Sequence, residues 1–265
     1  MKTQGKNWLI PMACILLISA RSIANAGAMG GESRTPSGTI YMGAFGGGGG
    51  DTSVNLFQQG TALLNYDSTS GSINNGGPLA VNSLGKSSSG SAWLVGGKVG
   101  YRWSERPLNY VSSNWAFAPA TELEGFYLGR STMVGAHLDN KTTRLYEHDF
   151  RVTYPMNAGV FLVNGLLNGR SASLGRFQPY IGVGAGVAVI SISGSNSLQT
   201  TPPEVGVNHY NSDTNDTSLA FAAQPKIGVS FNMSQNTNIF VEYRFLYLSV
   251  SNYTFGSTVY SSIKS

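Results

Sequence analysis

Two glutamates, Glu122 and Glu124, have the spacing of a carboxylate pair on one face of an extended strand. Two carboxylates can share the work of acid/base catalysis, one as general acid and the other as general base. Side chains two residues apart on a strand point to the same side. Residues 117–129 around them show no evident cleft for water or substrate. We therefore interpret the pair as partners for basic side chains.

Three histidines, His137, His148 and His209, are the other candidates for chemistry. No two of them have the spacing of a metal site or of a metalloprotease helix. The stretch "EHD" at 147–149 could place a histidine beside a carboxylate, as a surface protease or lipid-A deacylase would need. Adjacent strand residues point to opposite faces, so the three side chains cannot meet one substrate. We predict no catalytic residue, no metal site and no cofactor.

The stretch "YIGVGAGVAVI" at 180–190 places Gly182, Gly184 and Gly186 at every second position. A phosphate-binding loop would use such glycines for close backbone approach, but it needs a helix after it. The continuation "VAVISISGSNS" has no helical character. The alternation predicts a strand with apolar residues on one face and glycines on the other, where they leave room for larger side chains.

The N-terminus has the features of a secretory signal. Lys2 and Lys6 precede the apolar run "WLIPMACILLISA", and "ANA" then offers a cleavage site. We expect residues 1–26 to be the signal peptide and the mature chain to begin at Gly27; an uncleaved anchor is the alternative. Residues 27–36 would form a periplasmic extension, and 37–265 the folded domain.

Cleavage would remove Cys14, the single cysteine, and with it any disulfide or thiolate chemistry. The formal charge of +4 would fall to about +1, with 14 basic and 13 acidic residues left. The chain therefore shows no charge signature of nucleic-acid binding.

Composition then indicates the fold class. The sequence holds 34 glycines, only 11% charged residues and no stretch with helical periodicity after the signal. Alternating segments of about ten residues are typical of an antiparallel outer-membrane β-barrel. The predicted strands are 38–48, 91–103, 117–129, 149–162, 177–190, 223–233 and 239–247. This makes seven clear strands of an eight-stranded, up-and-down all-β barrel.

The alternation also predicts which residues face inward and outward. In a narrow barrel the inward charges must pair with one another. The predicted structural ion-pair network in the lumen comprises Lys98, Arg102, Glu122, Glu124, Arg151, Lys226, Glu242 and Arg244. The predicted lipid-facing aromatic belt comprises Trp93, Tyr101, Trp103, Tyr154, Tyr243 and Tyr247.

Connections of two lengths should separate the two ends of the barrel. Long Gly/Ser/Asn-rich loops at 51–90, 131–147 and 192–217 should face outward and be mobile. Shorter links at 104–116, 164–176 and 234–237 should face the periplasm.

Four stretches resemble one protein family: "SGTIYMGAFGG", "ELEGFYLG", "PYIGVGAGVAVI" and "AAQPKIGVSFNMSQNTNIFVEYRF". They are similar to the surface-antigen/opacity family of small, OmpA-like outer-membrane barrels, over roughly residues 37–249. The resemblance implies an eight-stranded barrel whose variable loops act as antigens or adhesins, with no active-site residues. The implied partners are outer-membrane lipid and lipopolysaccharide, the barrel-insertion machinery and host surface molecules.

A non-enzymatic surface protein is therefore the expected function. The alternatives are a barrel enzyme acting on lipid A or surface peptides and a narrow-pore channel. A soluble β-sandwich is disfavoured because aromatic and apolar side chains coat the outward face.

The last residues predict an incomplete barrel. Residues 258–265 are too few to cross the membrane, which takes about 9–11 strand residues. A hairpin turning near 255–256 could supply only a short eighth strand. We expect the first and seventh strands otherwise to keep free edges, as in a truncated or frame-shifted family member.

Overall fold

A computed structural model describes residues 2–5, 8–22, 38–62, 79–107, 115–140, 149–201, 203, 205–234 and 237–258. These residues form a 14-stranded sheet and one 3₁₀ turn, η1 (Ala172–Leu174). The strands are β1 (Lys2–Gly5), β2 (Trp8–Ser22), β3 (Thr39–Gly50), β4 (Asn55–Ala62), β5 (Leu79–Ser87), β6 (Ser91–Arg102), β7 (Arg106–Pro107), β8 (Trp115–Asn140), β9 (Asp149–Ser171), β10 (Phe177–Ile192), β11 (Asn196–Thr201), β12 (Asp216–Asn232), β13 (Thr237–Leu248) and β14 (Ser251–Thr254).

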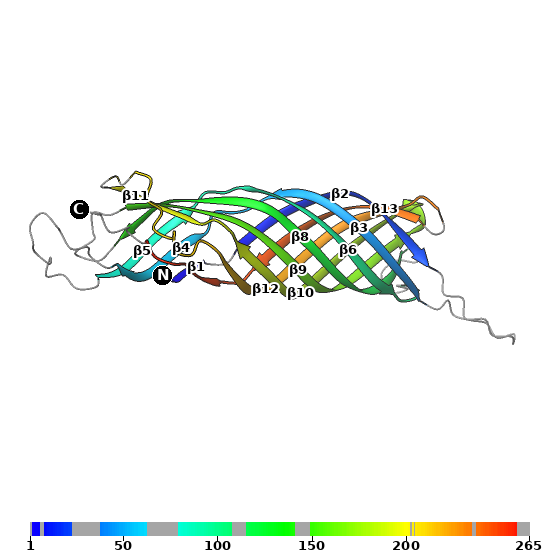
Figure 1. Ribbon diagram of the computed structural model, residues 1–265. Coiled ribbons are helices and arrows are strands. Elements are labelled where there is room, and N and C mark those ends of the chain that lie inside the picture. Colours follow the sequence, from blue (N-terminus) through cyan, green and yellow to red (C-terminus); the bar gives the residue numbers. More distant parts are fainter. Residues whose placement is uncertain are drawn as a thin grey trace, which may run out of the picture.

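Eight of these strands close into a barrel. Antiparallel pairings run around the ring in the order β2, β3, β6, β8, β9, β10, β12 and β13, and β13 pairs back to β2. The strands are visibly inclined to the long axis of the molecule (Figure 1). The predicted all-β antiparallel barrel is therefore confirmed, and the seven predicted segments correspond to β3, β6, β8, β9, β10, β12 and β13.

The eighth position in the ring is filled by β2, which lies in the segment predicted as a secretory signal. β2 pairs with β13 from Trp8↔Leu248 to Ala20↔Thr237. On its other side it pairs with β3 from Met12↔Gly49 to Ser22↔Ile40. The free edges expected on the first and seventh strands are therefore absent from the described structure, because β2 covers both.

The two ends of the barrel differ. Turns around η1 and residues 233–234 lie at one end, together with the link after β6; we call this the turn end. At the other end, the loop end, β8 and β9 extend beyond the ring and pair with β5 and β11 (Figure 1). β4 and β5 form a hairpin, and β1 bridges β4 and β14.

Several segments predicted as loops contain strands, so this part of the prediction is wrong. Segment 51–90 contains the β4–β5 hairpin, 192–217 contains β11, and β8 runs through 131–140. Segment 164–176, predicted as a link, is mostly the end of β9. The added strands lack strong apolar alternation, but their backbones find hydrogen-bonding partners. β5 and β11 pair with the overhanging edges of β8 and β9, and β4 pairs with β5 and β1.

Side chains of the described barrel strands fill most of the interior, apart from a cavity near the turn end. Inward side chains toward the loop end form an apolar core that includes Phe45, Leu94, Phe126, Val160 and Ile190. Charged side chains occupy the middle, and a smaller cluster around Ala120, Leu166 and Tyr180 lies nearer the turn end. The interior is packed because an eight-stranded barrel leaves only enough width for side chains.

Candidate functional site

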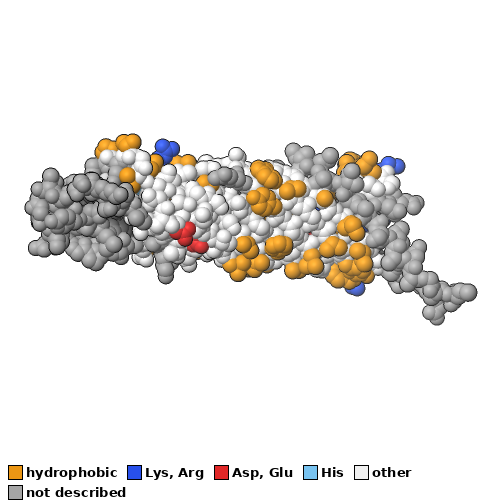
Figure 2. Space-filling view, in the orientation of Figure 1, with side chains coloured by type: hydrophobic (Ala, Val, Ile, Leu, Met, Phe, Trp, Pro, Cys, Tyr) orange, Lys and Arg blue, Asp and Glu red, His pale blue; other side chains and the backbone are white. Residues whose placement is uncertain are grey.

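The outward face of the barrel carries an apolar band. Exposed large apolar side chains come from every barrel strand whose side chains are described, and they gather over the turn-end part of the surface (Figure 2). The outward positions of these strands within the band carry no Asp, Glu, Lys or Arg. The band includes Ile40, Met42, Val95, Val99, Leu123, Phe161, Val163, Ile181, Val183, Leu219, Phe221, Ile227, Val229 and Val241.

Tryptophans mark the two edges of this band. Trp93 packs against Tyr127 with ring centroids 5.7 Å apart, and Trp103 meets Tyr101 edge to face at 5.3 Å. Trp93 and Trp103 are ten residues apart. At about 3.4 Å per residue and about 45° tilt, they are separated by about 24 Å along the barrel axis. That height matches the apolar band of a membrane-spanning β-barrel, about 25 Å.

Most of the predicted belt residues lie on this outer face. Trp93, Tyr101, Trp103 and Tyr243 are between 38% and 52% exposed, and Tyr247 is partly exposed. Tyr154 is a correction, because it points inward and is only 2% exposed. The residues of 149–162 divide between two faces as predicted, but the face predicted to meet lipid points inward and the face predicted to line the lumen points outward. The interior of the loop-end half is apolar, so apolar residues of β9 do not have to face lipid.

A group of six buried charged side chains lies in the middle of the barrel, and we call it the ion cluster. Lys226 and two carboxylates form its centre. The Nζ of Lys226 lies 2.6 Å from Glu122 Oε1 and 2.9 Å from Glu124 Oε2. Both glutamates point inward from β8 and are at most 3% exposed. The strand geometry thus brings the pair together on one face, where a cation occupies the space between the two carboxylates.

Three further members complete the ion cluster. Arg244 pairs with Glu124 through Nη1 and with Glu242 through Nη2. The Nζ of Lys98 lies 3.5 Å from Glu122 and 3.9 Å from Glu242. The three carboxylates and three cations have balanced formal charge, and each side chain is at most 7% exposed.

Neutral side chains fill the remaining hydrogen-bonding positions. Asn164 Nδ2 donates to Glu122 at 3.3 Å and to Glu124 at 2.7 Å. Gln224 Nε2 donates to Glu124 at 3.0 Å and to Asn164 Oδ1 at 2.9 Å. Neither amide was among the predicted members of the lumen network: Asn164 fell in the predicted link 164–176, whereas the alternation around 223–233 places Gln224 on the same face as Lys226. Buried ions need such additional hydrogen bonds, because their attraction alone does not offset the loss of hydration.

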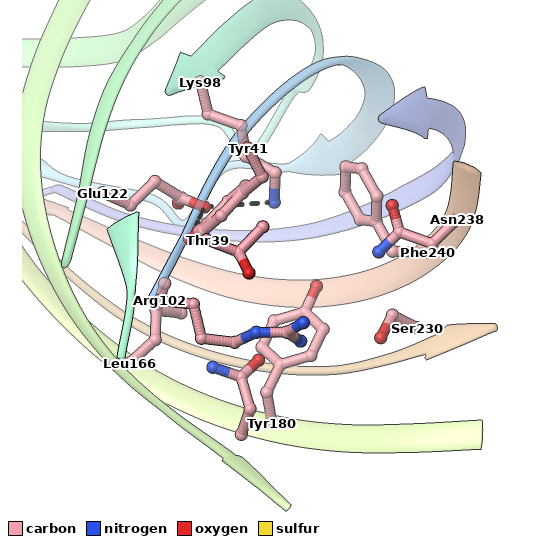
Figure 3. A pocket seen from close by; sticks show the side chains of 11 residues that line it. Thr39, Tyr41, Lys98, Arg102, Glu122, Leu166, Tyr180, Ser230, Asn238 and Phe240 are labelled. Atoms are coloured by element: carbon pink, nitrogen blue, oxygen red, sulfur yellow. Dashed lines mark hydrogen bonds and ion pairs between the residues drawn. The ribbon is translucent and has the colours of Figure 1, made fainter. Parts of the chain in front are cut away.

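Two tyrosines cap the turn-end side of the ion cluster. Tyr41 Oη donates to Glu122 Oε2 at 3.1 Å, and Tyr180 Oη donates to Glu242 Oε2 at 2.9 Å. Between them lies a cavity of about 50 Å³, lined also by Lys98 and Arg102 (Figure 3). A cavity of this size has room for a few water molecules. Its lining includes Lys98 and Glu122 of the ion cluster but not Glu124, Lys226 or Arg244.

Arg102 and Arg151, both predicted members of the lumen network, are placed differently. Arg102 points inward but lies at the turn end, where its Nη1 donates to Gln178 Oε1 at 3.2 Å. Among the described residues no ion pair joins it to the cluster. Arg151 is exposed on β9 beside β11, so its assignment to the lumen is wrong. The odd-numbered residues of β9 face away from the interior, and Arg151 follows that alternation.

Aromatic side chains close the loop end of the interior. Tyr154 Oη and Tyr210 Oη are 3.2 Å apart, and both rings pack on Phe255. The side chain of Asn208 links the segments of this closure, since its Oδ1 accepts hydrogen bonds from the backbone amides of Ser197 and Tyr210. The loop end is therefore a folded cap above the barrel.

Tyr253 in β14 belongs to the same cap. It is 4% exposed, and its hydroxyl accepts a hydrogen bond from Ser251 Oγ at 3.0 Å. Burial raises the pKa of Tyr253 to about 12, and the nearby carboxylate of Asp216 acts in the same direction. The neutral phenol is thus the form that the folded cap favours.

No catalytic constellation is visible among the described histidines and acids. The amide of His209 donates to Ser197 O at 2.9 Å, and its ring lies edge-on to Phe150 at 5.3 Å. His148 and the side chain of His137 lie outside the described part of the chain. Within that part, no three His, Cys, Asp or Glu side chains could hold a metal, and no helix is long and apolar enough to cross a membrane.

A closed antiparallel ring with an apolar band edged by tryptophans defines the class of small transmembrane β-barrels. No family model matches the chain, and no curated protein matches its sequence. The resemblance to the surface-antigen/opacity family therefore stays an expectation.

Among solved structures, the outer membrane protease OmpT from Escherichia coli aligns over 96% of this chain and 97% of its own. The identity is 9% and the TM-score 0.26. OccK11 (OpdR) from Pseudomonas aeruginosa aligns over 94% and 96%, at 8% identity and a TM-score of 0.10. Similarities this low define neither the fold nor the activity of this chain.

Proposed function

We propose that this chain is a non-enzymatic protein of the Gram-negative outer membrane, which displays its folded loop end at the cell surface as an antigen or adhesin. The observation that carries the proposal is the asymmetry of the barrel. The interior is blocked by the ion cluster and the aromatic cap, whereas β1, β4, β5, β11 and β14 all extend the loop end beyond the apolar band. Loops presented on a rigid scaffold are the usual place for recognition.

The proposed partners are those that the sequence resemblance implies. The apolar band would contact membrane lipid, and the loop end would meet lipopolysaccharide and then host surface molecules. Insertion would depend on the barrel-insertion machinery, as for the family that the sequence resembles. None of these contacts requires a cofactor or nucleic acid.

Protease treatment of intact cells tests the orientation. We expect cleavage within 51–90 or 192–217 and protection of the turns near 172–176 and 233–236. Cleavage confined to the turn end would reverse the topology and overturn the proposal.

Replacing His148 with Ala tests the enzymatic alternative. The variant should leave lipid-A structure and surface proteolysis unchanged, because adjacent strand residues point to opposite faces and 147–149 would not meet one substrate together. Loss of either activity on this substitution would establish an enzyme in place of a display protein.

A further inference from the structure

A second pocket lies at the turn end, outside the ion cluster. It has room of about 420 Å³ and is lined by the arginines Arg102, Arg170 and Arg176, together with Glu105 and Gln178. Arg102 also lines the smaller inner cavity (Figure 3), so the two share this residue. Segments far apart in the sequence, the ends of β6 and β9 and the turn before β10, meet here.

The charge of this pocket is strongly unbalanced. Glu105 is the one acidic lining residue, and it pairs with Arg170 across 3.2 Å at the exposed rim. Arg102 is half-buried at the floor, where its Nη1 donates to the neutral Gln178. Arg176 is exposed at the rim. Three guanidinium groups against one carboxylate leave a net charge of about +2 in a concave site, which attracts anions.

Arginine geometry narrows the class of anion. A guanidinium group presents planar, forked donors that match the oxygens of phosphate or carboxylate groups. The three guanidinium groups line different parts of the pocket, Arg102 at its floor and the other two at its rim. The pocket therefore suits a phosphate, which offers oxygens in several directions.

The position of the pocket suggests the source of that phosphate. Met233 lines it and is 55% exposed, and the exposed Phe177 lies next to its lining residues Arg176 and Gln178. Trp103, at the edge of the apolar band, directly follows Arg102. Exposed aromatics at such an edge mark the level of the lipid headgroups.

We propose that this pocket binds the phosphate of an anionic phospholipid headgroup in the leaflet at the turn end. Arg102 would contact the phosphate from the floor, Arg170 and Arg176 would close over it from the rim, and Met233 and Phe177 would lie against the acyl-chain side. The site would anchor the barrel at a fixed depth in the membrane.

Lipid retention by the purified full-length barrel tests the proposal. The protein in detergent is mixed with phosphatidylglycerol or phosphatidylcholine, and bound lipid is counted by native mass spectrometry. Wild type should prefer phosphatidylglycerol, and R170Q/R176Q should lower its affinity by about tenfold or more. The matched control is R151Q, which removes an exposed arginine of the same strand, β9, near the loop end; it should bind as wild type does. All variants must still shift on a gel between boiled and unboiled samples.

Two further measurements test whether arginine geometry matters beyond charge and whether the ligand is a lipid or a soluble phosphate. R102K keeps the charge but loses the fork, so it should weaken phosphatidylglycerol binding without changing net charge. Inorganic phosphate, followed by phosphorus NMR, reports on soluble anions. Phosphate binding without a preference for phosphatidylglycerol would overturn the lipid assignment. Equal lipid binding by wild type and R170Q/R176Q, or an equal loss in R151Q, would overturn the site. None of these results depends on the function of the loops.

Discussion

At the scale of single residues, the carboxylates of the ion cluster offset a repulsion between two cations on neighbouring strands. Lys226 and Arg244 are directly opposite each other on β12 and β13, a pairing that would repel by itself. Glu124 and Glu242 each contact both cations, with Lys226 Nζ 2.9 Å and 3.5 Å from them. Removing the charge of either carboxylate should therefore weaken the pairing of these two strands.

Substitution of Glu242 by Gln tests this dependence. The change removes a counter-charge of Lys226, Arg244 and Lys98 in a dry interior, so we expect a loss of about 3–5 kcal/mol in unfolding free energy. Urea unfolding in lipid vesicles, followed by tryptophan fluorescence, gives the number. Glu105→Gln is the matched control, because its pair with Arg170 is exposed and worth at most about 1 kcal/mol. Equal midpoints for the two variants would contradict the assignment.

Gly184 has a role that only its lack of a side chain permits. A Cβ at this position would overlap Asn164 Oδ1, which accepts the hydrogen bond from Gln224 beside the ion cluster. We expect Gly184→Ala to destabilise the barrel by about 1–3 kcal/mol, the usual cost of overpacking.

Gly165→Ala is the control for this substitution, because a Cβ there meets nothing within 4 Å. The same unfolding measurement compares the two alanine variants. A control variant as unstable as Gly184→Ala would mean that general effects of alanine in these strands, and not contact with Asn164, explain the loss.

At the scale of elements, strand β2 decides whether the ring is closed. It pairs with both β3 and β13, whereas β1 pairs only with β4 and β14 at the loop end. The same residues carry the features of a cleavable signal. One segment cannot be both a removed signal and a strand of the mature barrel, so the two interpretations make opposite predictions about truncation.

Removal of residues 1–26 should impair barrel formation if β2 closes the ring. The edges of β3 and β13 would then face lipid, where each unsatisfied backbone group costs several kcal/mol. We expect chain 27–265 to fold into lipid vesicles far less completely than chain 1–265, judged by the gel shift on boiling. Chain 6–265, which lacks β1 alone, should fold normally. Full folding of chain 27–265 would show that β2 is dispensable, and the mass of protein recovered from membranes would show whether cleavage before Gly27 occurs.

At the scale of the whole molecule, the packing of the interior bears on whether the barrel can conduct. Arg244 is the largest of the fully buried side chains among the described residues. Its guanidinium carbon lies 4.5 Å from the ring centroid of Phe45 and 5.2 Å from that of Phe126. It thereby joins the charged middle to the apolar loop-end core. A narrow pore would require this contact to open.

Planar-bilayer recordings test this closure. We expect wild type to show no steady conductance, since an eight-stranded barrel filled with side chains leaves no aqueous path. Arg244→Ala removes the bridging side chain and leaves a void beside Glu124 and Glu242, whose remaining cationic contacts are to Lys226 and Lys98. Brief openings should therefore appear in this variant. Steady current through the wild type would restore the narrow-pore alternative.

The sequence by itself determined where most of the barrel strands lie and which residues of each strand share a face, because side-chain alternation with a period of two is a local property of extended backbone. It was sufficient to predict seven barrel strands, the inward positions of Lys98, Glu122, Glu124, Lys226, Glu242 and Arg244, and the outward position of most belt aromatics. It was also sufficient to set aside a nucleotide loop at Gly182, Gly184 and Gly186, which lie in β10.

Only the tertiary structure decided which face of β9 is inside at the loop end, and so the places of Tyr154 and Arg151. That choice depends on whether the opposing interior is apolar or polar, and the opposing residues come from distant strands. The amide partners of the ion cluster, the β4–β5 hairpin and the identity of the eighth strand depend in the same way on contacts between segments far apart in the chain. Local alternation fixes which residues share a face, but the closing of the ring fixes what that face meets.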